Sequence, residues 1–311
     1  MDGTGTATKT IFIDGEAGTT GLGIRQRLEG LAGVSVRQID PALRKDAKAR
    51  QAMFASVDLV VLCLPDDAAK EAVALMDGLG DQAPRVVDAS TAHRVAPGWV
   101  YGFPELSADH KAKVAGAKRV GNPGCYPTGA IALVRPLIDS GLMAKDFPLT
   151  VNAVSGYSGG GKSMIETYES GKTPSFELYA LGLEHKHVPE LMEYTGLAKR
   201  PIFVPSVGNF RQGMLVSVPV HLDMLKGTPK AADLHAVLAK RYAGSEYVKV
   251  LPAEANGKLE AESLNNTNDL ELRVFGNDKR GHAVLVAKLD NLGKGASGAA
   301  VQNIRTMLGL A

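Results

Sequence analysis

The stretch Thr10–Gly21, TIFIDGEAGTTG, decides how the first part of this 311-residue chain is built. Residues Thr10–Asp14 form a short β-branched and apolar run, which is typical of a buried strand. The run breaks at Gly15, and Gly18 and Gly21 follow at intervals of three before the helix-favouring residues 22–28. The stretch therefore predicts a strand, a glycine turn and a helix in immediate succession.

Downstream of this stretch, apolar strand patterns continue to alternate with helical ones. The segments concerned are Val34–Ile39 (strand), Ala42–Phe54 (helix), Val57–Leu64 (strand), the helix start at Pro65-Asp66-Asp67, and Arg85–Asp88 (strand). Val57–Leu64 is apolar apart from Asp58, as in strands buried on both faces of a parallel sheet, and Cys63 within it is expected to be a buried packing residue. Alternation of this kind predicts an α/β fold with a doubly wound parallel sheet.

The texture of the sequence changes after Cys125. Strand-like segments there are joined by longer and less regular connections: Leu149–Ser155, Ile202–Val204, Met214–Leu222, Leu270–Phe275 and Ala283–Leu289. This pattern predicts a second, α+β domain with a mainly antiparallel sheet, followed by a last helix over Gly298–Leu310. We expect residues 1–124 to form a dinucleotide-binding domain that residues 291–311 complete, and residues 125–290 to form a catalytic and dimerisation domain.

The glycine turn is a candidate nucleotide loop. Backbone amides between a strand and a helix, together with the helix N-terminus, can hold a pyrophosphate. The expected cofactor-binding residues are Gly15, Gly18, Thr19, Thr20, Gly21 and Pro65. The spacing departs from the commoner G-x-G-x-x-G pattern, so a merely flexible turn is the alternative.

Residues after the second predicted strand bear on the choice of cofactor. Asp40 lies where an acidic residue often binds the adenosine ribose of NAD, whereas Arg44 and Lys45 could hold the 2′-phosphate of NADP. The two basic residues favour NADP(H). The alternative is that both are solvated charges on a helix.

Cys125 is the candidate nucleophile. It lies in Asn122–Gly129, NPGCYPTG, directly before the apolar stretch 130–137, which is predicted to be helical. A cysteine close to a helix N-terminus is favoured as the thiolate, which is the reactive form. The alternative is a packing residue at a helix start.

His185 and His187 form a second candidate cluster in a chain that has only seven histidines. Either one could act as general acid and base, because the ordinary pKa of histidine lies near neutrality. Residues two apart on a strand face the same way, so a metal site is also considered. No second ligand cluster with suitable spacing accompanies them, and we expect no metal.

The loop Ser155–Lys162, SGYSGGGK, resembles a cradle for an anion. Gly156–Ser163 formally matches the G-x-x-x-x-G-K-S spacing of a nucleoside triphosphate loop. A nucleotide loop is already present at Gly15, so a smaller substrate phosphate is the favoured ligand. A plain flexible loop is the alternative.

Taken together, these segments resemble N-acetyl-γ-glutamyl-phosphate reductase in its shorter form, within the aspartate-semialdehyde dehydrogenase-like group. The matching stretches cover nearly the whole chain in order: Ile11–Gly21, Tyr101–Leu106, Gly121–Thr128, Ser155–Gly159, His185–Glu190 and Asp290–Gly298. The cysteine segment and the last segment are the most specific of these.

The resemblance implies an NADP(H)-dependent reduction of N-acetyl-glutamyl 5-phosphate to the 5-semialdehyde in arginine biosynthesis, through a thioester on Cys125. It implies His187, or else His185, as the general acid and base. The remaining implied residues are Ser155, Ser158 and Lys162 near the leaving phosphate, Arg211 or Arg94 on the substrate carboxylate, and Asn291 near the nicotinamide with a close backbone approach at residues 293–295. Lys162 stands where longer family members have arginine, which leaves the exact substrate contacts open.

Composition limits the partners. The 35 basic and 33 acidic residues are scattered without a basic block, so no nucleic-acid partner is expected. No apolar run approaches the roughly 20 residues that span a bilayer, and Met1–Thr10 does not read as a signal sequence. We therefore expect a cytoplasmic protein without a disulfide, with a small acyl phosphate as its substrate and a homodimer or homotetramer as its assembly.

Overall fold

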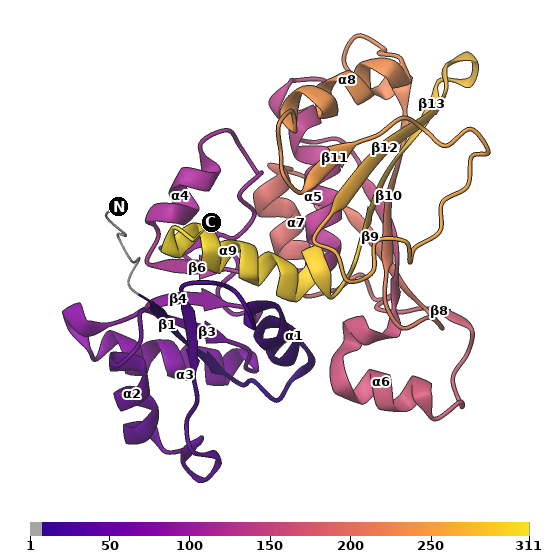
Figure 1. Ribbon diagram of the computed structural model, residues 1–311. Coiled ribbons are helices and arrows are strands. Elements are labelled where there is room, and N and C mark those ends of the chain that lie inside the picture. Colours follow the sequence, from indigo (N-terminus) through magenta and orange to yellow (C-terminus); the bar gives the residue numbers. More distant parts are fainter. Residues whose placement is uncertain (1–7, 311) are drawn as a thin grey trace, which may run out of the picture. The chain divides into compact units, whose positions relative to one another are not determined.

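The computed structural model describes residues 8–310 (Figure 1). The prediction that Met1–Thr10 is not a signal sequence falls mostly on residues 1–7, which lie outside the described residues. The chain divides into two compact units. Unit 1 comprises Met1–Pro104, Lys111–Asn122 and Ser297–Ala311, and unit 2 comprises Glu105–His110 and Pro123–Ala296.

Unit 1 is built on a parallel sheet, sheet A. Within residues 8–310 it has six strands in the order β2-β1-β3-β4-β6-β5, and every pairing between neighbours is parallel. Its strands are β1 (Lys9–Asp14), β2 (Val34–Arg37), β3 (Leu59–Leu62), β4 (Arg85–Asp88), β5 (Val100–Tyr101) and β6 (Arg119–Gly121). Chain order reverses direction between β1 and β3, which is where ligands bind in such sheets.

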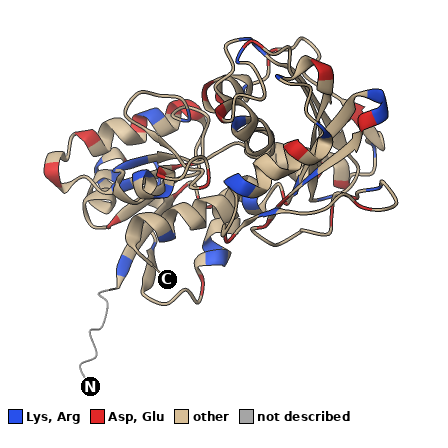
Figure 2. Ribbon diagram, turned by 90° about the horizontal axis from the view of Figure 1, so that it is seen from above, with Lys and Arg blue, Asp and Glu red and all other residues tan. Residues whose placement is uncertain are grey.

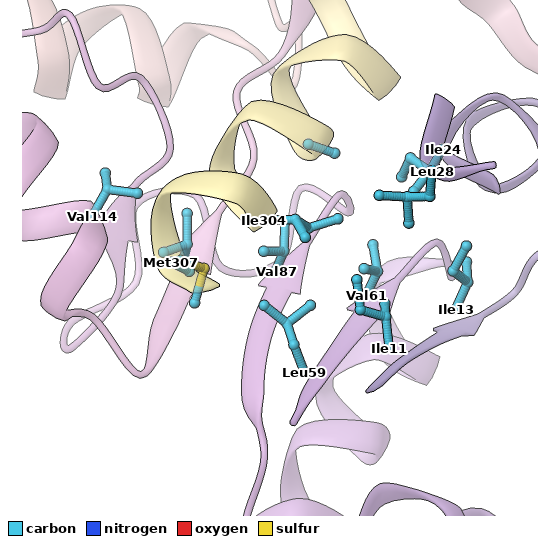
Figure 3. Close-up of a cluster of buried hydrophobic side chains, with 12 residues drawn as sticks. Ile11, Ile13, Ile24, Leu28, Leu59, Val61, Val87, Val114, Ile304 and Met307 are labelled. Atoms are coloured by element: carbon cyan, nitrogen blue, oxygen red, sulfur yellow. The ribbon is translucent and has the colours of Figure 1, made fainter. Parts of the chain in front are cut away.

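Helices cover both faces of sheet A. The helices are α1 (Thr19–Leu28), α2 (Ala47–Ala55), α3 (Asp66–Asp77), α4 (His110–Gly116) and α9 (Gly298–Leu308). One core cluster packs Ile11 and Ile13 of β1 against Ile24 of α1 and Ile304 of α9 (Figure 3). The other packs Phe12, which points to the opposite face, against α2 and α3. The predicted doubly wound parallel sheet is confirmed.

Several boundaries in unit 1 differ from the prediction. Strand β2 ends at Arg37 rather than Ile39. The helix predicted from Ala42 begins at Ala47, because the Asp46 carboxylate accepts the Ala49 N–H and caps it there. A short 3₁₀ turn, Pro41–Leu43, precedes it. Strand β3 ends at Leu62, so Cys63 follows the strand and does not lie inside it.

Unit 2 is built on a mixed sheet, sheet B, with seven strands among the described residues. Four of its pairings are antiparallel and two, β7 with β9 and β11 with β12, are parallel. The order is β11-β12-β13-β10-β7-β9-β8. The strands are β7 (Thr150–Gly156), β8 (Phe176–Leu178), β9 (Ile202–Gly208), β10 (Met214–His221), β11 (Val248–Val250), β12 (Leu270–Asn277) and β13 (His282–Leu289). A mainly antiparallel sheet was predicted and is confirmed.

The helices of unit 2 are α5 (Cys125–Asp139), α6 (Gly161–Glu169), α7 (Val188–Thr195) and α8 (Ala231–Arg241). Helix α5 is buried along most of its length and packs on β10 and β13, with α8 beside it over β12 (Figure 1). Across residues 8–310, no helix has both the length and the apolar character to cross a membrane. Basic and acidic residues are interspersed along each unit (Figure 2).

Candidate active site

Cys125 is the first residue of α5, as its sequence context predicts. Gly124 precedes it in an extended conformation, and no side chain caps the helix. The partial positive charge of the helix N-terminus therefore acts on the Cys125 sulfur, which is partly exposed. Pro127 fits in this first turn, where a backbone N–H has no partner within the helix.

A buried carboxylate lies beside this helix start. Glu190 Oε2 accepts the Gly124 N–H at 2.9 Å, and the Glu190 side chain is 1% exposed. This contact joins the histidine segment to the cysteine segment. Sequence reasoning missed Glu190 as a site residue, although a glutamate in the first turn of a helix after a Val-Pro pair is a recognisable helix-start signal.

The two histidines lie near Tyr126, the residue that follows Cys125. The ring of Tyr126 is 5.8 Å from that of His187 and 6.2 Å from that of His185, and the two imidazoles are 4.7 Å apart. His187 is buried at the N-cap of α7. In the described part of the chain, no group of three or more potential metal ligands includes them.

The environment of the two imidazoles differs. The backbone N–H of His187 donates to His185 Nδ1 at 3.1 Å, so this ring nitrogen acts as the acceptor. Burial, with a contribution from the Lys186 ammonium, lowers the pKa of His185 to about 4. His185 is consequently neutral near pH 7 and a poor proton donor, which leaves His187 as the better candidate for general acid.

A glycine-rich turn packs against Cys125. The segment Gly293–Ser297 forms a π-helical turn, and the buried Asp290 carbonyl accepts the N–H groups of Gly293 and Gly295. A Cβ on Gly295 would lie 2.8 Å from Cys125 Cβ. A Cβ on Gly293 would collide with the Thr267 carbonyl oxygen. Gly293 and Gly295 thus lie close to other parts of unit 2, while the approach to the nicotinamide that the family resemblance implied for residues 293–295 stays a prediction.

The serine loop and Asn291 belong to one hydrogen-bond network. Asn291 Nδ2 donates to Ser158 Oγ at 2.9 Å, and its Oδ1 accepts the Gly213 N–H at 2.8 Å. Ser155 is buried, and its hydroxyl donates to the Gly156 carbonyl. Gln212 Nε2 donates to the Asp290 carboxylate at 2.6 Å. Three segments that lie far apart in the sequence thus meet within unit 2.

Tyr126 and Tyr179 provide an apolar but hydrogen-bonded wall near Cys125. The Tyr179 hydroxyl donates to that of Tyr126 at 3.2 Å, and Tyr126 donates to the Ser206 carbonyl. Burial raises the pKa of Tyr179 to about 12 and raises that of Tyr126 further. Both phenols are therefore neutral donors at any working pH.

Lys162 and Arg211 are placed differently from the rest of the predicted substrate site. Lys162 is exposed on α6, and its Nζ lies 3.8 Å from Glu166 Oε1. Arg211 Nη1 donates to Glu169 Oε1 at 2.6 Å. Each is thus held by an acidic partner at the surface of unit 2. Lys162 follows a short 3₁₀ turn, Tyr157–Gly160, that links β7 to α6.

The predicted cofactor residues lie at the switch point of unit 1. Gly15 has a φ of +86°, and a Cβ there would collide with the Cys63 carbonyl oxygen. A Cβ on Gly21 would lie 2.7 Å from the Glu16 Cα. Gly18 is the N-cap of α1, Thr19 and Thr20 are its first residues, and Pro65 is the N-cap of α3. Glycine is therefore required where the chain turns closely between β1 and α1.

The charged candidates of unit 1 are mostly exposed. Asp40 Oδ1 accepts the Ala42 N–H, so its carboxylate caps the 3₁₀ turn. Arg44 and Lys45 are exposed after that turn. Arg37, which sequence reasoning did not single out, is exposed at the end of β2. Arg94, by contrast, is buried after β4 and donates to the Ala89 carbonyl at 3.2 Å.

A doubly wound nucleotide-type sheet combined with a mixed-sheet unit that presents a cysteine at a helix start defines a class of oxidoreductase. Two family models match this division. Residues 22–114 match the semialdehyde dehydrogenase NAD binding domain, and residues 125–291 match the semialdehyde dehydrogenase dimerisation domain.

Curated relatives narrow the class. Proteins of Brucella ovis and Brucella canis named N-acetyl-gamma-glutamyl-phosphate reductase are 52% identical to this chain over 307 residues, covering 96% of this chain and 98% of theirs. The chain belongs to the N-acetyl-gamma-glutamyl-phosphate reductase family.

Solved structures agree on the fold. Aspartate semialdehyde dehydrogenase II from Vibrio cholerae matches with a TM-score of 0.70 at 14% identity, over 97% of this chain and 98% of that one. The aspartate semialdehyde dehydrogenase of Candida albicans, solved with NADP, matches with a TM-score of 0.65 at 14% identity, over 98% of this chain and all of that one.

Proposed function

We propose that the protein reduces N-acetyl-glutamyl 5-phosphate to N-acetylglutamate 5-semialdehyde and phosphate with NADPH, a step of arginine biosynthesis. The observation that carries the proposal is the setting of Cys125. It is the first residue of a buried helix, with Glu190 fixing the residue before it and Gly295 against its Cβ. The names of the curated relatives support the substrate.

Cys125 is the proposed nucleophile. Its thiolate attacks the acyl carbonyl carbon, the bond from that carbon to the phosphate oxygen breaks, and inorganic phosphate leaves with the bonding electron pair. A thioester remains on Cys125. After reduction of this thioester, the carbon–sulfur bond of the thiohemiacetal breaks, the aldehyde forms and the thiolate is regenerated.

His187 is the proposed general acid and base. It protonates the oxyanion that develops during reduction and takes the same proton back when the thiohemiacetal collapses. Its buried place at the start of α7 and its 5.8 Å ring contact with Tyr126 support this role. The depressed pKa of His185 argues against His185 in it.

NADP(H) is the proposed cofactor, and the glycine turn of unit 1 fits its phosphates. Steric demands at Gly15 and Gly21 leave a narrow backbone turn before α1, where amides of Gly18, Thr19 and Thr20 can face an anion. When bound, NADPH would supply the hydride that reduces the acyl group.

Three exposed cations are the proposed 2′-phosphate ligands: Arg37, Arg44 and Lys45. The Asp40 carboxylate already caps its own turn, which makes it less available for a ribose hydroxyl. This competition supports NADPH over NADH.

For the substrate, we propose that Ser155 and Ser158 lie near the leaving phosphate, because Asn291 ties Ser158 to the segment that packs on Cys125. Lys162 could join them only by leaving Glu166. Arg94 or Arg211 would bind the carboxylate through two parallel hydrogen bonds. Replacing each arginine by methionine tests the choice, because loss of the arginine that binds the carboxylate should raise the KM for the substrate much more than loss of the other.

We further propose a homodimer formed by the face of sheet B that α5 and α8 do not cover. This face carries apolar side chains of several strands, among them Leu178, Leu215, Phe275, Val284 and Val286, around a hollow of about 700 Å³. An apolar lining suits a second copy of the chain better than a charged acyl phosphate. The matched dimerisation domain supports this choice.

We also propose that the protein is located in the cytoplasm, because its chemistry needs a reduced thiol and NADPH.

The proposed function is tested by a reductase assay on purified protein with N-acetyl-glutamyl phosphate and aspartyl phosphate, each with NADPH and with NADH. We expect turnover with the first substrate and a preference for NADPH. Cys125→Ser should abolish turnover and leave NADPH binding intact. Reduction of aspartyl phosphate alone, or normal turnover of Cys125→Ser, would contradict the proposal.

A further inference from the structure

Two buried carboxylates stand in one row at the carboxyl edge of sheet A. Asp14 pairs in register with Leu62, and Leu62 pairs with Asp88, so the two acidic side chains lie on the same face. Asp14 is 7% exposed and Asp88 is fully buried. Asp14 directly precedes Gly15, so a negative charge lies next to the turn proposed to bind phosphates.

Each carboxylate has its own partners. Asp88 accepts the N–H and the hydroxyl of Ser90 at 2.9 and 2.7 Å and lies 2.6 Å from His93 Nδ1. Asp14 Oδ2 accepts from Nε and Nη2 of Arg50 on α2, at 3.2 and 2.8 Å. Only the partner of Asp14 is a permanent cation, and it too is 7% exposed.

The field of these carboxylates reaches the neighbouring strand end. Burial first, and then the charges of Asp88 and Asp14, raise the pKa of the Cys63 thiol to about 12. A second acid, Glu71 on α3, lies 3.6 Å from Arg50 but is largely exposed and therefore screened by water. Without Arg50, an anion at this edge would meet an uncompensated buried charge.

We infer that Arg50 is a positioning residue for the cofactor: it cancels the charge of Asp14 and thereby allows the Gly15–Gly21 turn to accept dinucleotide phosphates. The inference rests on the proposed cofactor site. Arg50 acts through Asp14 and needs no contact with the cofactor. The two halves of this ion pair should therefore affect cofactor binding in opposite directions, although loss of either half lowers stability.

The test compares dissociation constants of NADPH for four variants with their thermal midpoints. Arg50→Met should raise the dissociation constant of NADPH by about tenfold or more, as expected for one uncompensated charge roughly 8 Å from a phosphate at an effective dielectric constant near 20. Asp14→Asn should leave affinity unchanged or raise it. The double variant Arg50→Met/Asp14→Asn should return to within about threefold of the wild-type value, and Arg50→Lys should fall between.

Two probes and one control separate charge from structure. Arg50→Met should weaken the binding of 2′,5′-ADP, whose 5′-phosphate can occupy the turn, far more than the binding of 2′-AMP, which lacks that phosphate. Lys70→Met changes the net charge by the same amount at an exposed pair with Asp67 on α3 and should leave all three ligands unaffected. If Arg50→Met fails to fold, Asp14→Asn, the double variant and Arg50→Lys still decide the matter.

Equal losses in Arg50→Met and Asp14→Asn, or a double variant as weak as Arg50→Met, would overturn the role of Arg50 and leave an ordinary structural ion pair. A wild-type chain that binds no NADPH would overturn the cofactor site itself, and the inference with it. The two failures are therefore distinguishable.

Discussion

Substitution of Gly295 by alanine tests how tightly the glycine turn fixes Cys125, the proposed nucleophile. The added Cβ would lie 2.8 Å from Cys125 Cβ and 3.1 Å from the Asp290 carbonyl oxygen, whereas ordinary contact starts at 3.4 Å. Relief requires a movement of about 0.6 Å at Cys125 or in the turn, because neither neighbour is the end of a flexible side chain. Overpacking of this kind costs about 1–3 kcal/mol of stability.

Activity should suffer more than stability in Gly295→Ala. A misplacement near 1 Å at reacting atoms can cost about a hundredfold in rate, so we expect kcat to fall by roughly tenfold to a hundredfold. The assays are steady-state reduction and the rate of Cys125 alkylation by iodoacetamide between pH 5 and 9. Gly182→Ala is the matched control, because nothing lies within 4 Å of the added Cβ. Wild-type kcat and alkylation in a folded Gly295→Ala protein would refute the reasoning.

Four further outcomes are expected. Gly15→Ala should strongly weaken NADPH binding and leave the rate of Cys125 alkylation unchanged, because the strain lies in unit 1. Titration calorimetry measures the NADPH affinity, and an unchanged affinity would contradict the cofactor site. Glu190→Ala should cost about 1–3 kcal/mol in urea unfolding by removing a buried acceptor, whereas Glu190→Gln should cost less, and equal costs would argue against the hydrogen bond. The folded pKa of His185, about 4, lies below its unfolded value, so the unfolded chain binds more protons between pH 6.5 and 4. The free energy of unfolding should therefore decrease as the pH is lowered across that window, and it should decrease less in His185→Gln. Val284→Glu should shift the sedimentation coefficient towards the monomer, and an unchanged coefficient would contradict the proposed dimer face.

Local signals carried much of the fold and one part of the site. The β-branched run before Gly15 and the turn-rich start before the apolar stretch of α5 are short-range patterns, and both gave the correct element at the correct place. Boundaries that depend on competing caps were less predictable. Asp40 and Asp46 each cap their own backbone, which splits a predicted single helix into a 3₁₀ turn and α2.

Contacts between distant segments could not be read from one sequence. Gly124 and Glu190 are 66 residues apart, and nothing in either segment specifies that the amide of one meets the carboxylate of the other. The same holds for Arg50 and Asp14, since a buried ion pair between a strand end and a helix depends on how α2 packs on sheet A. Short edge strands such as β8 and β11 also escaped prediction, because three residues carry too little periodicity.

The most direct test of the account is to look for the acyl group on Cys125. Wild-type protein mixed with N-acetyl-glutamyl phosphate in the absence of NADPH should release about one phosphate per chain in a burst. Mass spectrometry should then find the N-acetyl-glutamyl group on the peptide that contains Cys125, and the adduct should disappear when NADPH is added. Phosphate release that needs NADPH, or an acyl group found elsewhere in the chain, would contradict a thioester mechanism at Cys125.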